Sequence, residues 1–597
     1  MRAMSRLLLA SAATLASLVA QAQAHPPDVV LTPLGSQREF VPLGRNPEPH
    51  NVCRVGTSQI AAYDPLSRRL FVTDALADPD HNSLDILDIR EPLHPVLIER
   101  IKVSDLTGSA NFDDYEPPGV ASAFGLVALA VEANHPVKAN GRILLLDHDG
   151  RLLRTFDALG SGPERVAFSP NGRYIVAAVQ GEQDPADGTD PKGGITVIDL
   201  SRGIRRAQAR FADFAHFSSQ RLVAQGVRIG PDPNDPSKLN PAAFDLEPHS
   251  ITVSPDSHTA FATLEHNNAL ALVDLRSATV TAVLPFGLKD HARPRNGLDA
   301  SKKDGLNIAR WPVRGAYMPD GIGAFAVHGR PFLVTANEGD TRDLLVPGDA
   351  EPASVSDAIQ VDDPSVALDP AVFPATGPNG LPLKDDSNLG GLEVSSLLQD
   401  ARPNALGQYR RLVSFGGRSL SVWTTDGQRV YDSGDQLERI TSDASRSSAA
   451  AAALFNTPDD DNSFDNRSPR RGPQPSGVVV GRVAGRTYGF IGLRKEGGIV
   501  VADLTNPDAG VPMAWFSTRD YTQSPKLDPN DPTGTTELDT HVQVNCARQG
   551  KPPADRSDLG PEGLLFIPAR LSPNLKPLLV VTYDTSGSTR LYEIDHR

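Results

Sequence analysis

Short apolar runs, each ended by a turn, recur along most of the chain. The segment RVAFSPNGRYIVAAVQGE…GGITVIDL (165–200) has the same order of features as SITVSPDSHTAFATLEHNNALALVDL (250–275). Both contain a short strand, an S-P-[ND] turn, a second apolar strand, a polar loop and a third strand. Val, Ile, Leu and Ala in short runs, separated by Gly, Pro, Asn and Asp, are typical of strands and turns. The pattern predicts repeated units of antiparallel β-structure.

Further copies bring the number of units to seven, and they occupy residues 59–89, 119–150, 321–340, 477–504 and 563–594. The fifth unit is interrupted, because its first strands lie in 321–337 and FGGRSLSVWTTDGQRVYDSG (415–434) resumes the pattern. Units of a few strands that cannot bury their own faces predict an all-β fold, a seven-bladed β-propeller with long loop insertions. A β-sandwich or a solenoid is the competing architecture. Helical periodicity is rare, and SDASRSSAAAAALF (442–455) is the best helix candidate.

The ends of the chain are expected to meet. The last unit has three obvious strands, so VVLTPLGS (29–36) is predicted to add a fourth and to close the ring, which removes two exposed sheet edges. The chain has only two cysteines, Cys53 and Cys546, and closure would bring their segments to neighbouring blades. We expect a disulfide between them in an oxidising compartment, while the count excludes a CxxC redox or zinc site.

The first 24 residues have the features of a cleavable signal peptide. Arg2 and Arg6 precede the apolar run LLLASAATLASLVA, and Ala22-Gln23-Ala24 is an A-x-A cleavage site. No later stretch approaches the length of a membrane span. We therefore expect export to the periplasm or outside the cell, and one propeller domain over 25–597. Its predicted insertions are about 202–246, 344–411, 441–474 and 506–558.

The formal net charge of −15, which becomes −17 without Arg2 and Arg6, makes nucleic acid an unsuitable partner. An acidic surface repels phosphate backbones, and no cluster of basic and aromatic residues offsets the repulsion. A cationic partner or a divalent metal suits the charge better, although net charge often reflects solubility alone.

Acidic residues recur at two positions of the unit. Just before the first strand lie Glu116, Glu164, Glu247, Asp320 and Glu562. After the second strand lie Asp74, Glu132, Glu182, Glu265, Glu338, Glu496 and Asp584. Since first strands line the channel of a propeller, these acids should gather around one mouth, where they repel each other unless a proton, water or a cation compensates. The simpler interpretation is ordinary turns whose acids point to water.

The stretch VTANEGDTRD (334–343) combines an amide, Asn337, with the three carboxylates Glu338, Asp340 and Asp343. The predicted metal ligands are Glu247, Glu265, Asp320, Asn337, Glu338, Asp340 and Glu562. Oxygen-rich sets of this kind suit Ca²⁺, with Mg²⁺ or Mn²⁺ as the other candidates. His249 and His266 flank two strands of the fourth unit and are candidate additional ligands, although such histidines are more often loop or half-buried residues. Arg418 in SFGGRSLSVW (414–423) is the candidate phosphate-binding residue.

Four blocks carry a resemblance to a known family: TANEGDTRD, FGGRSLSVW…VYDSGDQLE, YGFIGLRKEGGIVVADLTNP and DLGPEGLLFIP. They resemble the choice-of-anchor I family, which includes mesenchyme-specific cell-surface glycoproteins and bacterial proteins labelled atypical alkaline phosphatases. The resemblance implies a propeller-like fold. This chain departs from the family's acidic pattern at SPRRGPQPSG (468–477), where Gln474 and Ser476 are neutral, and at YDTSG (583–587).

Two functions are therefore expected as alternatives. The first is an exported binding or structural module with an acidic, cation-binding face for a small molecule, a mineral ion or a carbohydrate. The second is a metal-dependent phosphoester hydrolase in which the same acids hold the metal and Arg418 holds phosphate. The fold alone does not decide between them, because one fold supports many functions.

Overall fold

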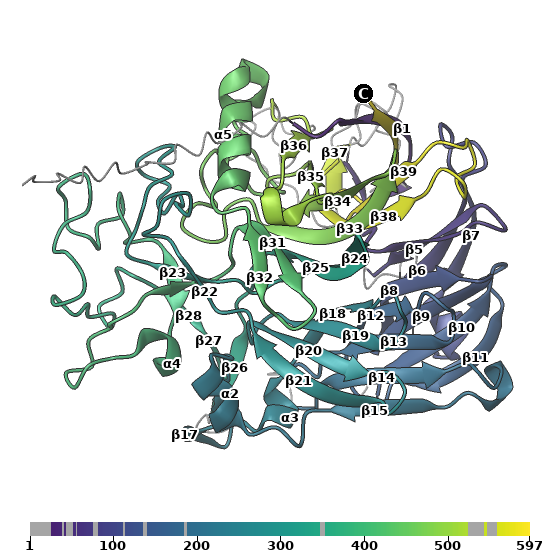
Figure 1. Cartoon of the computed structure of the whole chain (residues 1–597), viewed down its shortest axis with the longest axis horizontal. Helices are drawn as coiled ribbons and strands as arrows, with labels where there is room; N and C mark the ends of the chain where they lie inside the picture. Colours follow the sequence, from purple (N-terminus) through teal and green to yellow (C-terminus); the bar gives the residue numbers. More distant parts are fainter. Residues whose placement is uncertain are drawn as a thin grey trace, which may run out of the picture.

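The repeated units fold into four-stranded antiparallel sheets in the computed structural model (Figure 1). The structure describes residues 26–38, 41–42, 52–54, 57–75, 82–111, 114–134, 140–183, 188–346, 353–522, 543–545 and 558–597. Within these residues there are seven four-stranded sheets, and each corresponds to one unit of the sequence. The prediction of an all-β, seven-bladed propeller is confirmed.

The first three blades are built from strands that follow one another along the chain. Blade 1 contains β4 (Ala61–Asp64), β5 (Arg69–Asp74), β6 (Ser83–Asp88) and β7 (Val96–Lys102). Blade 2 contains β8 (Tyr115–Ala123), β9 (Leu126–Ala133), β10 (Arg142–Asp147) and β11 (Leu152–Asp157). Blade 3 contains β12 (Pro163–Phe168), β13 (Tyr174–Val179), β14 (Gly194–Asp199) and β15 (Ala209–Asp213).

Blades 4 to 7 complete the ring, with an interruption in blade 5 and a borrowed strand in blade 7. Blade 4 contains β18 (Pro248–Val253), β19 (Thr259–Leu264), β20 (Ala269–Asp274) and β21 (Thr279–Pro285). Blade 5 contains β24 (Ile322–Val327), β25 (Arg330–Asn337), β31 (Ser419–Thr424) and β32 (Arg429–Asp432). Blade 6 contains β33 (Pro475–Val483), β34 (Arg486–Leu493), β35 (Ile499–Asp503) and β36 (Met513–Phe516). Blade 7 contains β38 (Pro561–Ile567), β39 (Leu578–Tyr583), β40 (Ser588–His596) and β1 (Val29–Arg38).

The first strand of each blade contacts the first strand of the next, in the closed order β4, β8, β12, β18, β24, β33, β38 and back to β4. These strands therefore surround the propeller axis. All six residues of β13 are buried because adjacent blades cover both faces of the sheet, whereas the outer strand β11 is largely exposed. The hydrophobic core lies between blades, as where Leu145 of blade 2 and Ile175 of blade 3 belong to one cluster.

Strand β1 closes the ring, as predicted. It pairs antiparallel with β40, with Val29 opposite His596 and Leu31 opposite Ile594. Blade 7 also shares a buried apolar cluster with blade 1, in which Leu578 and Leu70 take part. The joint between the last and first blades is therefore packed like the other joints of the ring.

The predicted disulfide and leader fall partly or wholly outside the described residues. A small sheet joins β2 (Val41–Pro42), β3 (Val52–Arg54) and β37 (Gln543–Asn545), and it places Cys53 opposite Val544. Cys546 follows β37 directly but lies outside the described residues, so the disulfide stays a prediction. Residues 1–24 also lie outside them, and so does the predicted cleavage site.

A second sheet lies beside the ring (Figure 1, left). Its strands, in spatial order, are β22 (Leu288–Asp290), β23 (Arg314–Ala316), β30 (Val413–Ser414), β29 (Glu393–Ser395) and β28 (Ala358–Gln360). They come from the segment before blade 5 and from the insertion between β25 and β31. A separate core that includes Trp311, Leu389 and Val394 is buried around this sheet. Two short hairpins complete the strands: β16 (Pro231–Asp232) with β17 (Asp235–Leu239), and β26 (Asp343–Val346) with β27 (Ala353–Ser356).

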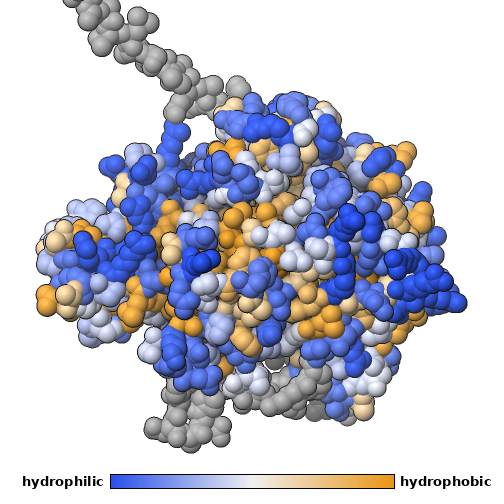
Figure 2. All heavy atoms as spheres, turned by 60° about the horizontal axis from the view of Figure 1, so that its bottom comes forward, coloured by the Kyte–Doolittle hydropathy of each residue, from blue (hydrophilic) through white to orange (hydrophobic). Residues whose placement is uncertain are grey.

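Helices are few and lie in the connections. The α-helices are α1 (Val103–Thr107), α2 (Ser219–Gln225), α3 (Ala242–Asp245), α4 (Leu398–Ala401) and α5 (Gln436–Ser447), and the 3-10 helices are η1 (Ile204–Arg206), η2 (Ala449–Ala451) and η3 (Pro507–Ala509). Among the described helices, none has the length and apolar character needed to cross a membrane. Figure 2 shows one face of the molecule, on which hydrophilic side chains predominate and apolar side chains form scattered groups.

Candidate functional site

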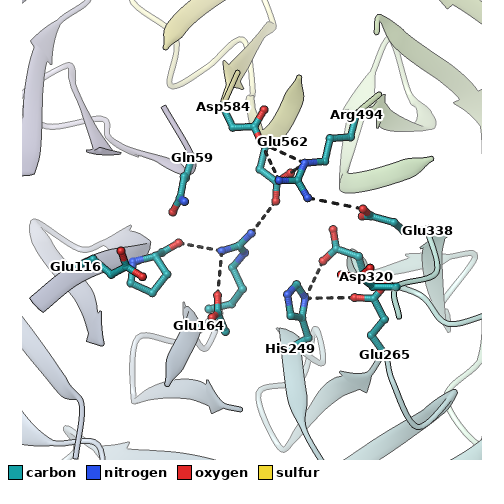
Figure 3. Close-up of a pocket in the computed structure, with 13 residues that line it drawn as sticks. Gln59, Glu116, Glu164, His249, Glu265, Asp320, Glu338, Arg494, Glu562 and Asp584 are labelled. Carbon is teal, nitrogen blue, oxygen red and sulfur yellow. Dashed lines mark hydrogen bonds and ion pairs between the residues drawn. The ribbon is translucent and has the colours of Figure 1, made fainter. Parts of the chain in front are cut away.

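Side chains from all seven blades meet in one cavity of about 200 Å³, which we call the mouth pocket (Figure 3). They follow from the repeat, because each blade places its residues at the start of its first strand or after its second. The lining residues, in blade order, are Gln59, Glu116, Pro118, Glu164, Arg165, His249, Glu265, Asp320, Glu338, Asp340, Arg494, Glu562 and Asp584. The gathering of acids that the repeat predicts is thus present in the structure.

Five of the seven predicted metal ligands line this pocket. Glu265 comes from blade 4, Glu562 comes from blade 7, and Asp320, Glu338 and Asp340 come from blade 5. Asp340 is held from outside the ring by Arg471, with 2.8 Å between the guanidinium and the carboxylate. The structure therefore brings together groups that are up to 297 positions apart (562 − 265) in the sequence.

Glu247 and Asn337 lie outside the pocket and have other partners. Glu247 is buried between His266 (Nδ1 to Oε2, 2.6 Å) and Arg342 (Nη1 to Oε1, 3.1 Å). The amide of Asn337 donates to the hydroxyls of Ser419 (3.0 Å) and Ser421 (2.8 Å) inside blade 5. Both residues hold the surrounding loops and strands in place.

Arg418 also lies outside the pocket. Its buried guanidinium donates to the backbone carbonyls of Asp299, Ser468 and Arg470 and to the Glu438 carboxylate, at 2.7–2.8 Å. Four acceptors occupy its donors in the described structure. It joins two loops instead of facing the cavity.

The most compact group in the mouth pocket is formed by His249, Glu265 and Asp320. One donor atom from each lies within 4.8 Å of the others. His249 Nδ1 is 2.9 Å from Asp320 Oδ1 and 3.9 Å from Glu265 Oε2. Glu265 is only 5% exposed, and its Oε1 has no hydrogen-bond partner among the described residues. A buried carboxylate oxygen without a donor is unfavourable unless something binds it.

Two arginines, Arg165 and Arg494, line the same cavity, and Figure 3 shows Arg494 beside Asp584 and Glu562. Arg494 contacts Asp584 (2.8 Å), Glu562 (3.1 Å) and Glu338 (3.7 Å). Arg165 contacts the other oxygen of Glu562 at 3.0 Å. The pocket thus has an arginine side near blades 3, 6 and 7 and a metal-ligand side near blades 4 and 5.

The charges in the mouth pocket do not balance. Eight carboxyl groups and three basic groups line it, so full ionisation gives a net charge of 3 − 8 = −5. Burial, reinforced by Asp320, raises the pKa of Glu338 to about 8. Burial also raises the pKa of Glu265 well above its usual value. Protons or a cation must supply the missing positive charge at neutral pH.

His249 and Asp320 form a charged pair within this surplus of acid. Burial alone would lower the pKa of His249, but the Asp320 carboxylate outweighs it and raises the pKa to about 10. Burial would likewise raise the pKa of Asp320, yet His249 holds it below its usual value. A metal ion bound by the His249 nitrogen would therefore have to displace a proton.

The donor set fits a divalent cation. Glu265 and Asp320 offer oxygens, His249 offers a ring nitrogen, and Glu265 Oε1 is free to bind. Carboxylates suit Ca²⁺, Mg²⁺ and Mn²⁺, whereas imidazole is a better ligand for transition metals. Among the three cations expected from the sequence, the histidine favours Mn²⁺.

Sequence reasoning singled out His249 but did not select the two arginines of the pocket, Arg165 and Arg494. The repeat alignment placed Glu496 at the acidic position of blade 6, but that carboxylate accepts a hydrogen bond from the Asn456 backbone (2.8 Å) away from the pocket. Arg494, which directly follows β34, enters the pocket instead. Its position after the second strand is the signal that was available, since blades 4, 5 and 7 place Glu265, Glu338 and Asp584 in the pocket from that position.

Comparisons with known proteins place the chain in a family. A profile of the choice-of-anchor I domain matches residues 59–507. The mesenchyme-specific cell surface glycoprotein of Strongylocentrotus purpuratus is 28% identical over 299 residues, which cover 46% of this chain and 37% of the relative. Gigasin-3a of Magallana gigas is 26% identical over 216 residues, which cover 36% of this chain and 66% of the relative. The chain thus covers less than two thirds of either relative.

Among solved structures, alignments to this chain have low sequence identity and low TM-scores. Hydrazine synthase of Kuenenia stuttgartiensis aligns with a TM-score of 0.40 and 11% identity, over 94% of this chain and 100% of that chain. The family assignment rests on the profile, which spans more than half of the chain. The protein belongs to the choice-of-anchor I family.

Proposed function

We propose that this protein is an exported binding module whose mouth pocket holds a divalent cation and, through it, a small oxygen-rich ligand. The observation that carries the proposal is the group of His249, Glu265 and Asp320, in which a buried carboxylate oxygen has no hydrogen-bond partner among the described residues. A cation there would satisfy this oxygen and reduce the surplus of negative charge around it, which is −5 at full ionisation. Mn²⁺ is the first choice and Ca²⁺ the second, because the group mixes nitrogen and oxygen donors.

The volume of the pocket limits the size of the ligand that it can hold. A cavity of about 200 Å³ is smaller than the roughly 300–1,000 Å³ typical of pockets for drug-sized molecules. It suits a metal ion with a phosphate, carbonate or carboxylate group better than a whole sugar. A carbohydrate or a mineral surface would bind by presenting one anionic group to the pocket.

Export is part of the proposal. The basic and apolar N-terminal segment with its A-x-A site supports it. The name of the sea-urchin relative, a cell surface glycoprotein, agrees with a location outside the cytoplasm. N-terminal sequencing of the natural protein and fractionation of the cells test this part. The proposal expects a mature chain that begins near His25 and lies in the periplasmic or extracellular fraction.

A metal-dependent phosphoester hydrolase is the second candidate, and the two arginines of the pocket favour it. Arg165 and Arg494 lie in the same cavity as the metal-ligand group, and guanidinium groups bind phosphate oxygens with paired hydrogen bonds. A bound metal ion would supply a polarised phosphate and an acidic water molecule. In this candidate Arg494 orients the phosphate group and gives up its contacts to Glu338 and Asp584 as it does so.

Metal binding and turnover are separable by experiment. The purified protein is stripped with a chelator and dialysed against Mn²⁺ or Ca²⁺, and the bound metal is measured in wild type, in Glu265→Gln and in the exposed control Glu99→Gln. The proposal expects Glu265→Gln to lose one bound ion and the control to keep it. Equal metal in all three proteins contradicts it. Phosphomonoester and phosphodiester assays with the loaded protein then test the second candidate, which requires turnover that Glu265→Gln abolishes.

A further inference from the structure

A second group of carboxylates lies outside the ring, where two loops meet. One loop, residues 299–307, belongs to the segment between β22 and β23, and the other, residues 456–468, joins α5 to β33. One carboxylate oxygen from each of Asp299, Asp304 and Asp465 lies within 4.8 Å of the others. None of these residues lines the mouth pocket.

The first loop holds its two aspartates by backbone contacts. Leu298 and Ala309 exchange two backbone hydrogen bonds, of 3.0 and 3.1 Å, which close the base of the loop. The backbone N–H of Asn307 donates to Asp299, and the side-chain amide of Asn307 donates to Asp304 at 2.7 Å. Asn307 therefore turns both carboxylates towards the same side.

The second loop supplies a buried acid with an unused oxygen. Asp465 is 1% exposed, and its Oδ1 accepts a hydrogen bond from the Ser468 hydroxyl. Its Oδ2 is buried and has no hydrogen-bond partner among the described residues. The same is true of Asn456 Oδ1, whose amide nitrogen donates to Ser468 at 2.7 Å. Two buried oxygens with free lone pairs in one network point to a bound ligand that accepts electron pairs.

Arg418 connects the two loops but does not balance their charge. It donates to the carbonyls of Asp299 and Ser468 and to Glu438, which itself contacts Asn456. The four acids Asp299, Asp304, Asp465 and Glu438 against this one arginine leave −4 + 1 = −3. Burial raises the pKa of Asp299 to about 8, and nearby acids add to the effect. Burial also raises the pKa of Asp465 to about 7.

We propose that Asp299, Asp304 and Asp465 form a second divalent-cation site that binds Ca²⁺ and ties the two loops together. The available donors are all oxygens, and Asn456 Oδ1 is a further candidate ligand. Ca²⁺ takes six to eight oxygen ligands in flexible geometry, and water reaches this group through the exposed Asp304. The site differs from the mouth pocket, which includes a histidine, and it is structural in role.

The decisive variant is Asp304→Asn, since this exposed residue is not needed to fill the core. Ca²⁺ binding is measured by equilibrium dialysis in a Glu265→Gln background, so that the mouth pocket does not contribute. Asp443→Asn, an exposed charge on the neighbouring helix α5, is the matched control. The proposal expects Asp304→Asn to bind Ca²⁺ at least tenfold more weakly than the control, and Asp465→Asn to lose the ion as well. If Asp465→Asn does not fold, Asp304→Asn decides alone.

Proteolysis provides a second measurement at the same place. Lys302 and Lys303 are exposed between two of the proposed ligands, so trypsin cleavage there reports the order of the loop. Ca²⁺ should slow this cleavage at least tenfold in the control and leave it unchanged in Asp304→Asn. Equal Ca²⁺ binding and equal protection in the two variants would overturn the proposal, whatever the result at the mouth pocket.

Discussion

The metal-free protein should become less stable as the pH rises from about 5 to 8, and Glu338→Gln should remove much of this dependence. Glu338 is 4% exposed, and burial raises its pKa from 4.5 to about 8. Between these values the folded protein keeps a proton that the unfolded chain releases. Stability contributed by the protonated form is therefore present below the unfolded pKa and is lost as the pH rises through this window.

The size of the effect follows from the two pKa values. Each pH unit inside the window costs about 1.4 kcal/mol, so the loss between pH 4.5 and 7 is about 3 kcal/mol. Glutamine has nearly the same shape and can still accept the hydrogen bond that Gln474 donates to Glu338. At pH 7 the metal-free variant should thus be more stable than wild type by about 3 kcal/mol, and at pH 5 by much less.

Urea unfolding followed by tryptophan fluorescence, with a chelator present, measures the free energy of unfolding of variant and wild type at pH 5 and at pH 7. Glu99→Gln, an exposed glutamate on β7, serves as the control and should behave as wild type. Added Mn²⁺ should stabilise wild type at pH 7 more than Glu338→Gln, because the ion replaces the missing positive charge. A pH dependence that is the same in Glu338→Gln and wild type would refute the reasoning, since Glu338 would then be ionised at little cost.

Three further predictions concern the frame around the site. Arg342→Met should lower the free energy of unfolding by about 3–5 kcal/mol in chemical denaturation. The substitution leaves the buried carboxylates of Asp245 and Glu247 without the arginine that pairs with both. Deletion of residues 26–38 should expose β40, lower the melting temperature and cause association visible by size-exclusion chromatography. If Cys53 and Cys546 are bonded, the non-reduced protein has no free thiols and reduction destabilises it by about 2–5 kcal/mol; two titratable thiols would contradict the disulfide.

The fold was accessible from the sequence because its information is local and repeated. Five of the seven blades consist of strands that follow one another along the chain, so the periodicity of the units was enough to predict the ring and its closure by residues 29–36. The helix was placed less well. Alanines suggested 442–455, but α5 covers Gln436–Ser447 and buries Leu437, Thr441 and Ser445 together with other residues of one face. Most of that buried face is polar, and Leu437 is its only buried apolar residue, so few apolar residues mark the helix in the sequence.

The site was predicted only in outline, because side-chain direction depends on distant partners. The recurrence of acids correctly indicated that Glu265, Glu338 and Glu562 would meet. It gave no sign that Glu247 would turn towards Arg342, a residue 95 positions away. Nor does the repeat indicate that Arg418 would be used to join two loops. Such pairings are set by the insertions, whose course is not repeated.

Closure by β1 also fixes when the protein can finish folding. Thr32 and Asp595 are neighbours although they are 563 positions apart, whereas the other six blades form from segments close in sequence or from one interrupted segment. During synthesis β1 must wait for β40, and a contact of such long range forms slowly. Until then two sheet edges remain open to other chains. A cell that makes this protein needs a means of keeping β1 apart from other strands until β40 has been synthesised.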